Sequence, residues 1–389
     1  MKDWTHILNH LGEERSNYYG ATVPPIIQSS NFAFDTVEDF RAALANEIDH
    51  HVYTRGNNPT TEILRIKLAA LEGAEDALVF GSGTAALAAA IIGNVKAGDH
   101  IICVNHPYAW TTKIVEGFLG RFGVEHTFVD GSSMTAIEAA IRPNTTLLIL
   151  ESPNSLTYEI QDLKACAALA KAHQITTIID NSYASPYYQN PIDFGIDIVV
   201  HSGSKYLNGH SDVLFGVVCG SKQMMKQLFS GEFATLGAVL SPHDAWLVIK
   251  GLRSLTTRLD RISKTTLEVI DWLKQQPQVE KILYPFDVDF PQYELARQQM
   301  RGAGGLFSVV FKADSIAKME QFCDALSNTF LMAVSWGGYK ALQVPTCVFY
   351  DQNGTSGSHL PFTFVRYCIG LEEASYLIDK WKEALPLLD

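Results

Sequence analysis

The sequence lacks the features that mark membrane and secreted proteins. In its 389 residues no apolar run approaches the ~20 residues that cross a bilayer. The first residues, MKDWTHILNH, have neither an apolar signal core nor an arginine-rich amphipathic transit pattern. The six cysteines are scattered, form no C-x-x-C pair and stand mostly inside apolar runs, so we expect buried thiols. These absences predict a cytoplasmic protein in a reducing compartment.

Positive charge is also scarce. Lysine and arginine number 30 against 42 aspartates and glutamates, which gives a net charge of −12. A balance this acidic argues against nucleic acid or an anionic membrane as a partner. Hydrophobic residues at 47% and charged residues at 19% fit a globular protein. The chain is too long for one compact core, so we expect an N-terminal arm over 1–51, a large domain over 52–241 and a C-terminal domain over 242–389.

The middle of the chain alternates short β-rich runs with amphipathic helical stretches. This alternation predicts an α/β fold with a central, mainly parallel sheet and helices on both faces. The last two β-rich runs are too close for a crossover helix, so they are expected to pair differently. The predicted strands are ALVF (77–80), HIICV (100–104), HTFV (126–129), TLLIL (146–150), TTIID (176–180), DIVV (197–200) and FGVVC (215–219).

The two ends of the chain show other patterns of hydrophobic residues. Residues 1 to about 50 show little continuous helical or strand period, and Pro24-Pro25 favours an extended path. A long helical stretch over 243–276 is interpreted as the bridge to the second domain. A smaller α/β domain is then predicted from two strands, 306–311 and 364–369, and a helix near 314–327.

One lysine stands directly after a buried-looking strand. Lys205 lies in HSGSKYLNGHSD, where Ser202, Gly203 and Ser204 separate it from the apolar run 198–200. Open α/β proteins place their sites at such strand ends, and small hydroxyl and glycine residues bring N–H and O–H donors close to an anion. A lysine held partly out of water can lose its proton and become a nucleophilic amine. By itself the segment also fits a surface lysine in a strand-to-helix turn.

An aspartate, Asp180, ends the strand TTIID that precedes the lysine segment. A carboxylate buried there needs a cationic or N–H partner. The ring nitrogen of pyridoxal phosphate (PLP) is such a partner, and the same molecule carries an aldehyde for a lysine amine. A helix N-cap is the alternative role. Two strand ends that converge on one acid and on Lys205 favour the cofactor.

A glycine-rich loop, FGSGTAA at 80–86, follows the first predicted strand and opens an alanine-rich helix. The N–H groups and dipole of such a helix start bind phosphate. The letters also fit the dinucleotide pattern G-x-G-x-x-A. That fold needs an acid at the end of the next strand, but HIICV ends in Asn105-His106-Pro107. The loop suits a phosphate such as that of PLP better, and a glycine turn that only packs helix on strand remains an alternative.

Four further residues, each with an aromatic ring or a positive charge, lie next to a strand, inside one or in a polar loop. Tyr108 follows the second strand and can either stack on a flat cofactor or belong to the core. Tyr53 and Arg55 form either a fork for phosphate or carboxylate, or a solvated pair. Arg366 lies inside the apolar run FVRYCIGL, where a charge needs a partner. That partner is a substrate carboxylate or a structural salt bridge.

In order and over nearly the whole chain, the motifs resemble those of the PLP-dependent enzymes of cysteine and methionine metabolism, the cystathionine lyase and synthase family. The resemblance implies a PLP-dependent aminotransferase-like fold (fold type I), with PLP bound by the large domain, and a small-molecule amino-acid substrate. It also implies a homotetramer built from two dimers that share their active sites. The matching motifs are VPPIIQSSNFAF, YTRGNNPT, FGSGTAA, ESPNS, DNSYASP, HSGSKYLNGHSD, SWGGY and VRYCIGLE.

The resemblance implies catalytic roles for three residues. Lys205 is expected to be the Schiff-base lysine that later serves as general base. Asp180 is expected to pair with the pyridine nitrogen, and Tyr108 to stack on the ring.

The remaining roles concern the phosphate and the substrate. The backbone N–H groups of two residues, Gly83 and Thr84, and the hydroxyls of Ser202 and Ser204 are expected to bind the phosphate. The resemblance assigns Tyr53 and Arg55 to the phosphate of the neighbouring subunit, and Tyr53 also to the substrate. The expected substrate-binding residues are Arg366, for the α-carboxylate, with Ser335 and Trp336.

The bond that breaks is indicated by two motifs. SWGGY at 335–339 resembles bacterial cystathionine β-lyases, in which a tryptophan replaces the leucine of the γ-enzymes. ESPNSL departs from the E-x-P-x-N-P of the γ-enzymes, with Ser155 in the slot of their asparagine and Asn154 one place early. We therefore predict a PLP-dependent carbon–sulfur lyase of the cystathionine β-lyase type, which converts L-cystathionine to homocysteine, pyruvate and ammonia in trans-sulfuration and methionine biosynthesis.

Other features leave alternatives open. YTRGNNPT is as close to the γ-type loop as to the β-type. Lys340 stands where many relatives have glutamate, and Lys113 where γ-enzymes often carry arginine. Cystathionine γ-lyase, cystathionine γ-synthase and methionine γ-lyase chemistry are thus alternatives. From other classes, an NAD-binding doubly wound protein fits the glycine pattern, and a non-catalytic family member fits the fold, although every position of the cofactor site is filled.

Overall fold

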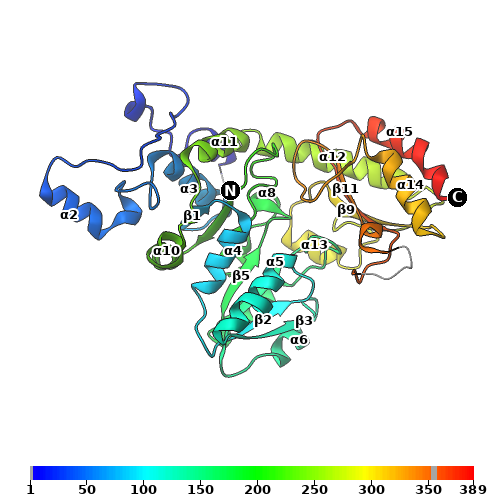
Figure 1. The fold of residues 1–389 in the computed structure, drawn as a ribbon, viewed down its shortest axis with the longest axis horizontal. Coiled ribbons are helices and arrows are strands. Elements are labelled where there is room, and N and C mark those ends of the chain that lie inside the picture. Colours follow the sequence, from blue (N-terminus) through cyan, green and yellow to red (C-terminus); the bar gives the residue numbers. More distant parts are fainter. Residues whose placement is uncertain (1–2, 352–356) are drawn as a thin grey trace.

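The computed structural model describes residues 3–351 and 357–389. Its strands form two β-sheets (Figure 1). None of the helices in these two ranges is long and apolar enough to cross a membrane. The first sheet contains β1 (Asp76–Phe80), β2 (His100–Val104), β3 (Glu125–Val129), β4 (Thr145–Glu151), β5 (Thr176–Asp180), β6 (Ile198–His201) and β7 (Gly216–Gly220). The second contains β8 (Val279–Leu283), β9 (Leu306–Phe311), β10 (Leu331–Met332), β11 (Leu342–Pro345) and β12 (Phe364–Cys368).

Helices separate most of the strands. They are α1 (Trp4–Asn9), α2 (Val37–Ala45), α3 (Pro59–Glu72), α4 (Gly83–Ile92), α5 (Ala109–Thr112), α6 (Met134–Ala139), α7 (Leu163–Ala172), α8 (Ser185–Tyr188), α9 (Lys222–Leu228), α10 (Ala234–Leu236), α11 (Pro242–Leu252), α12 (Leu255–Leu273), α13 (Tyr293–Gln299), α14 (Ile316–Leu326) and α15 (Ala374–Ala384).

The first sheet has the strand order β1-β7-β6-β5-β4-β2-β3. Its pairs are parallel except those that β7 makes with β1 and β6, which are antiparallel. The predicted mainly parallel sheet is confirmed, including the different pairing of its last run, since the connection over 202–215 contains no crossover helix. The strands β1, β6, β5, β4 and β2 consequently all end at the same edge of the sheet.

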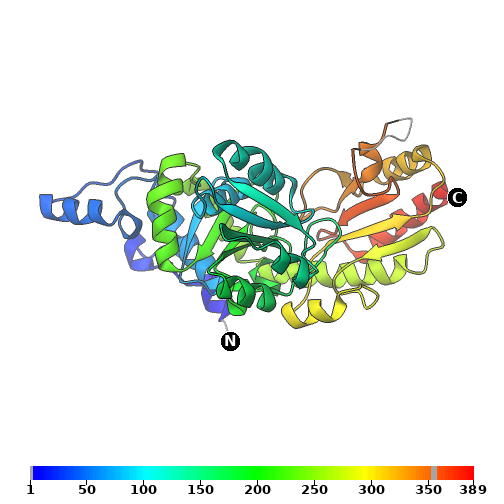
Figure 2. The same ribbon diagram turned by 90° about the horizontal axis from the view of Figure 1, so that it is seen from below.

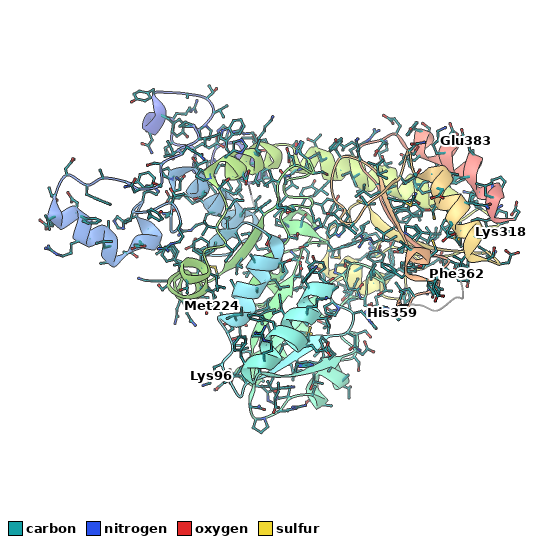
Figure 3. All side chains as sticks on the ribbon, viewed as in Figure 1. Lys96, Met224, Lys318, His359, Phe362 and Glu383 are labelled. Atoms are coloured by element: carbon teal, nitrogen blue, oxygen red, sulfur yellow. The ribbon has the colours of Figure 1, made fainter. Side chains whose placement is uncertain are left out.

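Buried side chains pack on both faces of this sheet; Figure 3 draws the side chains of the described residues on the ribbon. In β1, Ala77 and Val79 belong to one hydrophobic cluster, and Leu78 and Phe80 to another. Successive side chains of a strand point to opposite faces, so the two clusters are the packed layers on either side. Burial on both faces explains why the strands read as continuous apolar runs rather than as alternating ones.

The second sheet, of order β10-β11-β12-β9-β8, lies toward the C-terminal end of the molecule with α14 and α15 (Figures 1 and 2). The strands predicted at 306–311 and 364–369 and the helix near 314–327 are present as β9, β12 and α14. Three strands were not predicted. These are β8, of which two residues are exposed, and the short β10 and β11, whose sequences have no clear strand period.

The helical stretch predicted over 243–276 is two helices, α11 and α12, which break at Arg253-Ser254. The break has a structural cause in Arg258 of the second helix. Its guanidinium donates two hydrogen bonds to the carbonyl of Tyr206, each 3.0 Å, and its Nε donates to Ser254 Oγ. The helix that leads into the second sheet is thereby fastened to the residue after Lys205.

The N-terminal segment is less extended than predicted, because it contains α1 and α2. The region of Pro24-Pro25 itself carries no helix or strand, and the Pro24 carbonyl accepts a hydrogen bond of 2.9 Å from Trp246 Nε1 of α11. Helix α2 projects from the body of the molecule (Figures 1 and 2). Two of its apolar side chains, Phe40 and Leu44, are 44% and 49% exposed. The predicted burial of the cysteines is confirmed, since all six are buried free thiols.

Candidate functional site

The predicted site residues come from strand ends that meet at one edge of the first sheet. Glu151 ends β4 and is the register partner of Asp180, which ends β5. Asp180 is in turn the register partner of Val200 in β6, and the turn that carries Lys205 follows directly. Register partners on adjacent strands point to the same face. The sheet therefore places Asp180 and the turn that carries Lys205 at the ends of neighbouring strands.

Lys205 is partly buried, so the alternative of a surface lysine is wrong. Its Nζ donates to Ser202 Oγ at 3.1 Å and lies 5.6 Å from the centre of the Trp336 ring. Burial lowers the pKa of this amine, Arg366 lowers it further, and the carboxylate of Asp180 opposes both. A lowered pKa increases the fraction of neutral, nucleophilic amine at neutral pH.

Asp180 does not cap a helix. Helix α8 begins at Ser185 with Ala184 at its N-cap, whereas Oδ1 of Asp180 accepts hydrogen bonds from the backbone N–H, at 2.9 Å, and the hydroxyl of Ser182. These bonds fix the carboxylate at the end of β5. The hydroxyl of Ser182 also accepts the N–H of Ser202 at 2.6 Å, which ties the acid to the lysine turn.

The glycine loop forms the start of α4. Ser82 is the N-cap, and its side chain accepts from the N–H of Ala85 at 3.0 Å. The next residue, Gly83, lies against the lysine turn, since a Cβ on it would stand 2.7 Å from Cβ and 2.8 Å from Oγ of Ser202. Only glycine allows this approach. The start of the helix, with the N–H groups of Gly83 and Thr84, thereby lies next to Ser202, and together they are a candidate cradle for an anion.

We expect Gly83→Ala to weaken cofactor binding, because the added methyl must displace Ser202 from the helix start. Overpacking of this kind costs about 1–3 kcal/mol, which corresponds to a roughly five- to 150-fold higher dissociation constant. Fluorescence titration of the cofactor-free protein with PLP measures the change. Gly117→Ala is the matched control, since nothing lies within 4 Å of a Cβ there. Equal affinities of the two variants would contradict the cradle.

Ser204, also predicted to bind phosphate, uses its hydroxyl within the protein. It donates to the carbonyl of Phe215 at 3.2 Å and accepts from the N–H of the same residue at 2.8 Å. The hydroxyl thus closes the turn between β6 and β7. Its role toward phosphate stays a prediction, which requires the hydroxyl proton to turn from the Phe215 carbonyl to a phosphate oxygen.

Arg366, in β12, reaches the same edge from the second sheet. Nη1 donates to the carbonyl of Ser155 and Nη2 to that of Ser335, both at 3.2 Å. Over the described ranges no ion pair involves Arg366, so the salt-bridge alternative finds no support. Burial lowers the pKa of its guanidinium. A half-buried cation held only by carbonyls is suited to receive a carboxylate.

Trp336 packs between the two sheets and next to the lysine. It is 7% exposed, and its ring centre lies 5.2 Å from that of Tyr206. Gly337 follows in the left-handed region with φ of 78°, and a Cβ there would lie 3.1 Å from Lys205 Cα. The preceding Ser335 is also left-handed, with φ of 82°, which is uncommon for a residue other than glycine. The bend thus brings the backbone after the indole close to Lys205.

Tyr108 is at the N-cap of α5 and 41% exposed, so the alternative of a core tyrosine is wrong. Its N–H donates to Glu151 Oε2 at 2.6 Å. Glu151 is a functional candidate that the sequence analysis missed. Burial, followed by the charge of Asp180, raises the pKa of the Glu151 carboxyl to about 8.

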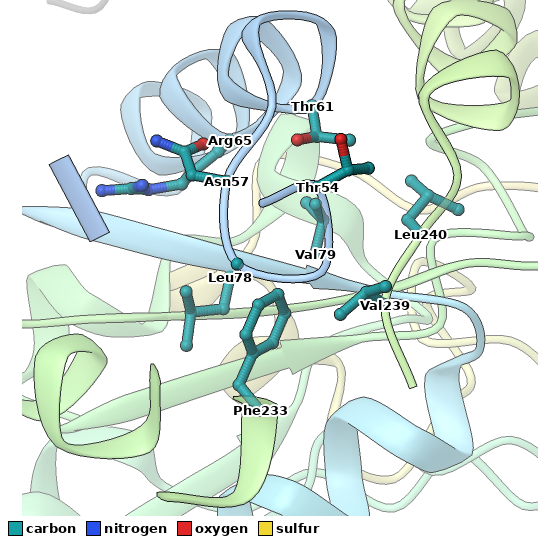
Figure 4. Close-up of a pocket in the computed structure, with 10 residues that line it drawn as sticks. Thr54, Asn57, Thr61, Arg65, Leu78, Val79, Phe233, Val239 and Leu240 are labelled. Carbon is teal, nitrogen blue, oxygen red and sulfur yellow. The ribbon is translucent and has the colours of Figure 1, made fainter. Parts of the chain in front are cut away.

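Tyr53 and Arg55 lie in a loop between the arm and α3. The Arg55 guanidinium carbon is 5.8 Å from the centre of the Tyr53 ring, and Tyr53 is 49% exposed. Hydrogen bonds from the side chains of Thr54 and Asn57 to backbone carbonyls anchor the loop around them. Thr54 and Asn57 line a small cavity with Val79 of β1 (Figure 4). Within one chain the pair therefore sits on a fixed, exposed surface, and its cationic end is open to a partner.

The two lysines at which the sequence departs from its relatives lie over aromatic rings. Lys113 Nζ is 5.2 Å from the centre of the Trp110 ring, and Lys340 Nζ is 5.7 Å from that of Tyr339. Asn154 acts within its own turn, since its Oδ1 accepts backbone N–H groups, among them that of Tyr158 at 2.8 Å. None of the three contacts identifies a substrate group.

The residues present fit PLP. The helix start at Gly83 and the hydroxyl of Ser202 form one anion cradle, the half-buried amine of Lys205 donates to that hydroxyl, and the fixed carboxylate of Asp180 acts on the same amine. A phosphate, an aldehyde and a ring nitrogen are the three groups of the cofactor that these parts would hold.

Comparison with known proteins agrees with this fit. Residues 5–386 match the sequence model of a family described as "Cys/Met metabolism PLP-dependent enzyme". An L-methionine gamma-lyase of Pseudomonas putida is 36% identical over 97% of this chain and 95% of its own length. A "Probable cystathionine gamma-synthase" of Herpetosiphon aurantiacus is 37% identical over 79% of this chain and 94% of its own length. The crystal structure of metB from Corynebacterium glutamicum superimposes with a TM-score of 0.91 at 33% identity, covering 100% of this chain and 99% of that one.

Proposed function

Because this chain belongs to the family of Cys/Met metabolism PLP-dependent enzymes, with the predicted PLP-dependent fold and cofactor, we propose that it is a carbon–sulfur lyase acting on cystathionine by β-elimination. The observation that carries the choice of bond is the buried Trp336, whose ring centre lies 5.6 Å from Lys205 Nζ. β-Elimination needs proton transfer at Cα only, whereas γ-chemistry also needs it at Cβ. An indole packed on the lysine limits the reach of the amine and so favours the simpler reaction.

The bound substrate is oriented by groups of this chain. Arg366 takes the α-carboxylate in a bidentate grip, and Ser335 and Trp336 border it from the same strained bend. When bound, PLP supplies an aldehyde that joins the substrate amine and a protonated ring that withdraws electrons from Cα. Asp180 keeps the ring nitrogen protonated by its negative charge, and the Tyr108 ring covers the cofactor face.

Lys205 performs the proton transfers. Its neutral Nζ, favoured by burial, takes the proton from Cα of the substrate as general base. The C–S bond at Cβ then breaks, and the sulfur departs with the electron pair. The same amine can return the proton to the departing thiolate, which gives homocysteine. The remaining three carbons and the amine nitrogen are released, after hydrolysis, as pyruvate and ammonia.

A second candidate is methionine γ-lyase chemistry. It is favoured by the L-methionine gamma-lyase relatives, which match 97% of this chain at 36% identity. The products separate the two. We expect incubation with L-cystathionine to yield pyruvate and homocysteine, identified by mass spectrometry, with little turnover of L-methionine. Release of 2-oxobutyrate with cysteine, or of 2-oxobutyrate with methanethiol from methionine, would assign γ-chemistry instead.

We also propose that the site is completed by a second copy of the chain, in a cytoplasmic homotetramer. The exposed pair Tyr53 and Arg55 would then contact the neighbour's phosphate. If so, mixing two inactive proteins, Lys205→Ala and Arg55→Ala, after dissociation and reassembly should restore part of the activity, because one site in each mixed dimer is intact. No recovery in mixed oligomers of confirmed composition would refute the shared site.

A further inference from the structure

Glu151, the last residue of β4, is a buried acid without a role in the proposed mechanism. It is 5% exposed, and each of its oxygens accepts one backbone N–H. Oε2 accepts from Tyr108 at 2.6 Å and Oε1 from Ser155 at 3.1 Å. The carboxyl therefore fastens the loop after β2 to the turn after β4.

Each of these segments adjoins a group to which the proposed function gives a role. The first N–H is that of Tyr108 itself, whose ring is half exposed. The carbonyl of Ser155 accepts from Nη1 of Arg366 at 3.2 Å. The register partner of Glu151 is Asp180. One side chain thus links the positions of the stacking ring, the carboxylate-binding cation and the acid at the ring nitrogen.

The rest of the turn after β4 is held without Glu151. Asn154 Oδ1 accepts the N–H groups of the following residues, from Leu156 at 3.2 Å, Thr157 at 2.9 Å and Tyr158 at 2.8 Å. The N–H of Ser155 is not among these. It is held by Glu151 instead, on the N-terminal side of the residue whose carbonyl Arg366 contacts; that carbonyl shares its peptide with the N–H of Leu156, which Asn154 holds.

We propose that Glu151 is a positioning residue, which sets the Tyr108 ring on the cofactor and the Arg366 guanidinium on the substrate carboxylate through these two N–H groups. The inference rests on the proposed function, from which the roles of Tyr108 and Arg366 are taken. A carboxyl is needed because it offers an acceptor on each side. A glutamine has one acceptor oxygen and an NH2 group that cannot accept, so Glu151→Gln must lose one bond.

The experiment compares Glu151→Gln with the wild-type protein in three measurements. We expect faster hydrogen exchange in peptides that contain Tyr108 or Ser155, measured without cofactor, because one of the two amides loses its acceptor. We expect a changed visible circular dichroism of bound PLP, which reports the ring's surroundings. With L-cystathionine, KM should rise about tenfold while kcat changes less, as when an interaction made equally in the ground state and the transition state is lost.

Glu125→Gln is the matched control, since this exposed acid pairs with Arg142 at the opposite end of the sheet; it should leave all three measurements unchanged. Glu151→Asp, which retains both oxygens on a shorter stem, provides a second variant if the glutamine does not fold. Unchanged exchange, dichroism and KM in a folded Glu151 variant would overturn the inference. A wild-type protein that does not cleave cystathionine would refute the proposed function alone, because exchange and dichroism still test Glu151.

Discussion

Lys205→Ala is expected to abolish turnover and to remove the visible absorption of the lysine-bound cofactor. The side chain carries two functions, the amine that bonds the aldehyde and the base that moves the Cα proton. A positioned general base alone contributes roughly 10²–10⁴-fold to a rate, so the residual activity should lie at least that far below wild type. The absorption spectrum of the purified protein and a pyruvate assay with L-cystathionine measure the two losses separately.

The control for Lys205→Ala is Lys222→Ala, at an exposed lysine that begins α9. It changes the net charge by the same amount but should keep colour and activity. PLP should still bind Lys205→Ala through the phosphate cradle and Asp180, but should be released on dialysis because no covalent bond retains it. Retained turnover in a Lys205→Ala protein with a correct mass would end the assignment of this lysine.

The first sheet could be predicted from the sequence because its strands are buried on both faces. Runs such as HIICV and TLLIL leave little alternative to a buried strand, and β2 and β4 match them within one residue at each end. The errors occur where local pattern and tertiary contacts disagree. Arg253-Ser254 stands inside a continuous helical pattern, but the helix breaks there as Arg258 turns toward the carbonyl of Tyr206. The sequence around Arg258 does not indicate its hydrogen bond to Tyr206, because that residue is distant along the chain.

Within the site, strand ends were predictable and the contacts between segments were not. Lys205 and Asp180 follow apolar runs, so a parallel sheet alone brings them to one edge. Glu151 was noticed only as a letter of a family motif. Glu151 directly follows the apolar run TLLIL, as Asp180 follows the apolar residues of TTIID. This likeness could have marked Glu151 as a site residue. That Trp336 lies beside Lys205, or that Arg366 has no acidic partner among residues 3–351 and 357–389, depends on how the two sheets meet.

Asp180→Asn is expected to reduce kcat by a large factor while leaving the protein folded and able to bind PLP. The carboxylate is fixed by Ser182 at the end of β5, and its charge stabilises the proton on the pyridine nitrogen. An asparagine keeps the shape but not the charge, so the ring loses that proton and withdraws electrons from Cα less strongly. Loss of one partner of a desolvated charge pair costs about 3–5 kcal/mol, or roughly a hundred- to several-thousandfold in rate.

A matched control for Asp180→Asn exists on the neighbouring strand. Asp197, directly before β6, accepts from the N–H of Thr177 at 2.8 Å and from its hydroxyl at 2.7 Å, at the opposite edge of the sheet. Asp197→Asn therefore removes an equally well-bonded carboxylate, and should lower the thermal midpoint without changing kcat or the spectrum. The ring proton also sets the position of the cofactor's absorption band, so Asp180→Asn should shift that band. An unshifted band with wild-type kcat would show that the acid does not face the ring nitrogen, and electron withdrawal would then need another source.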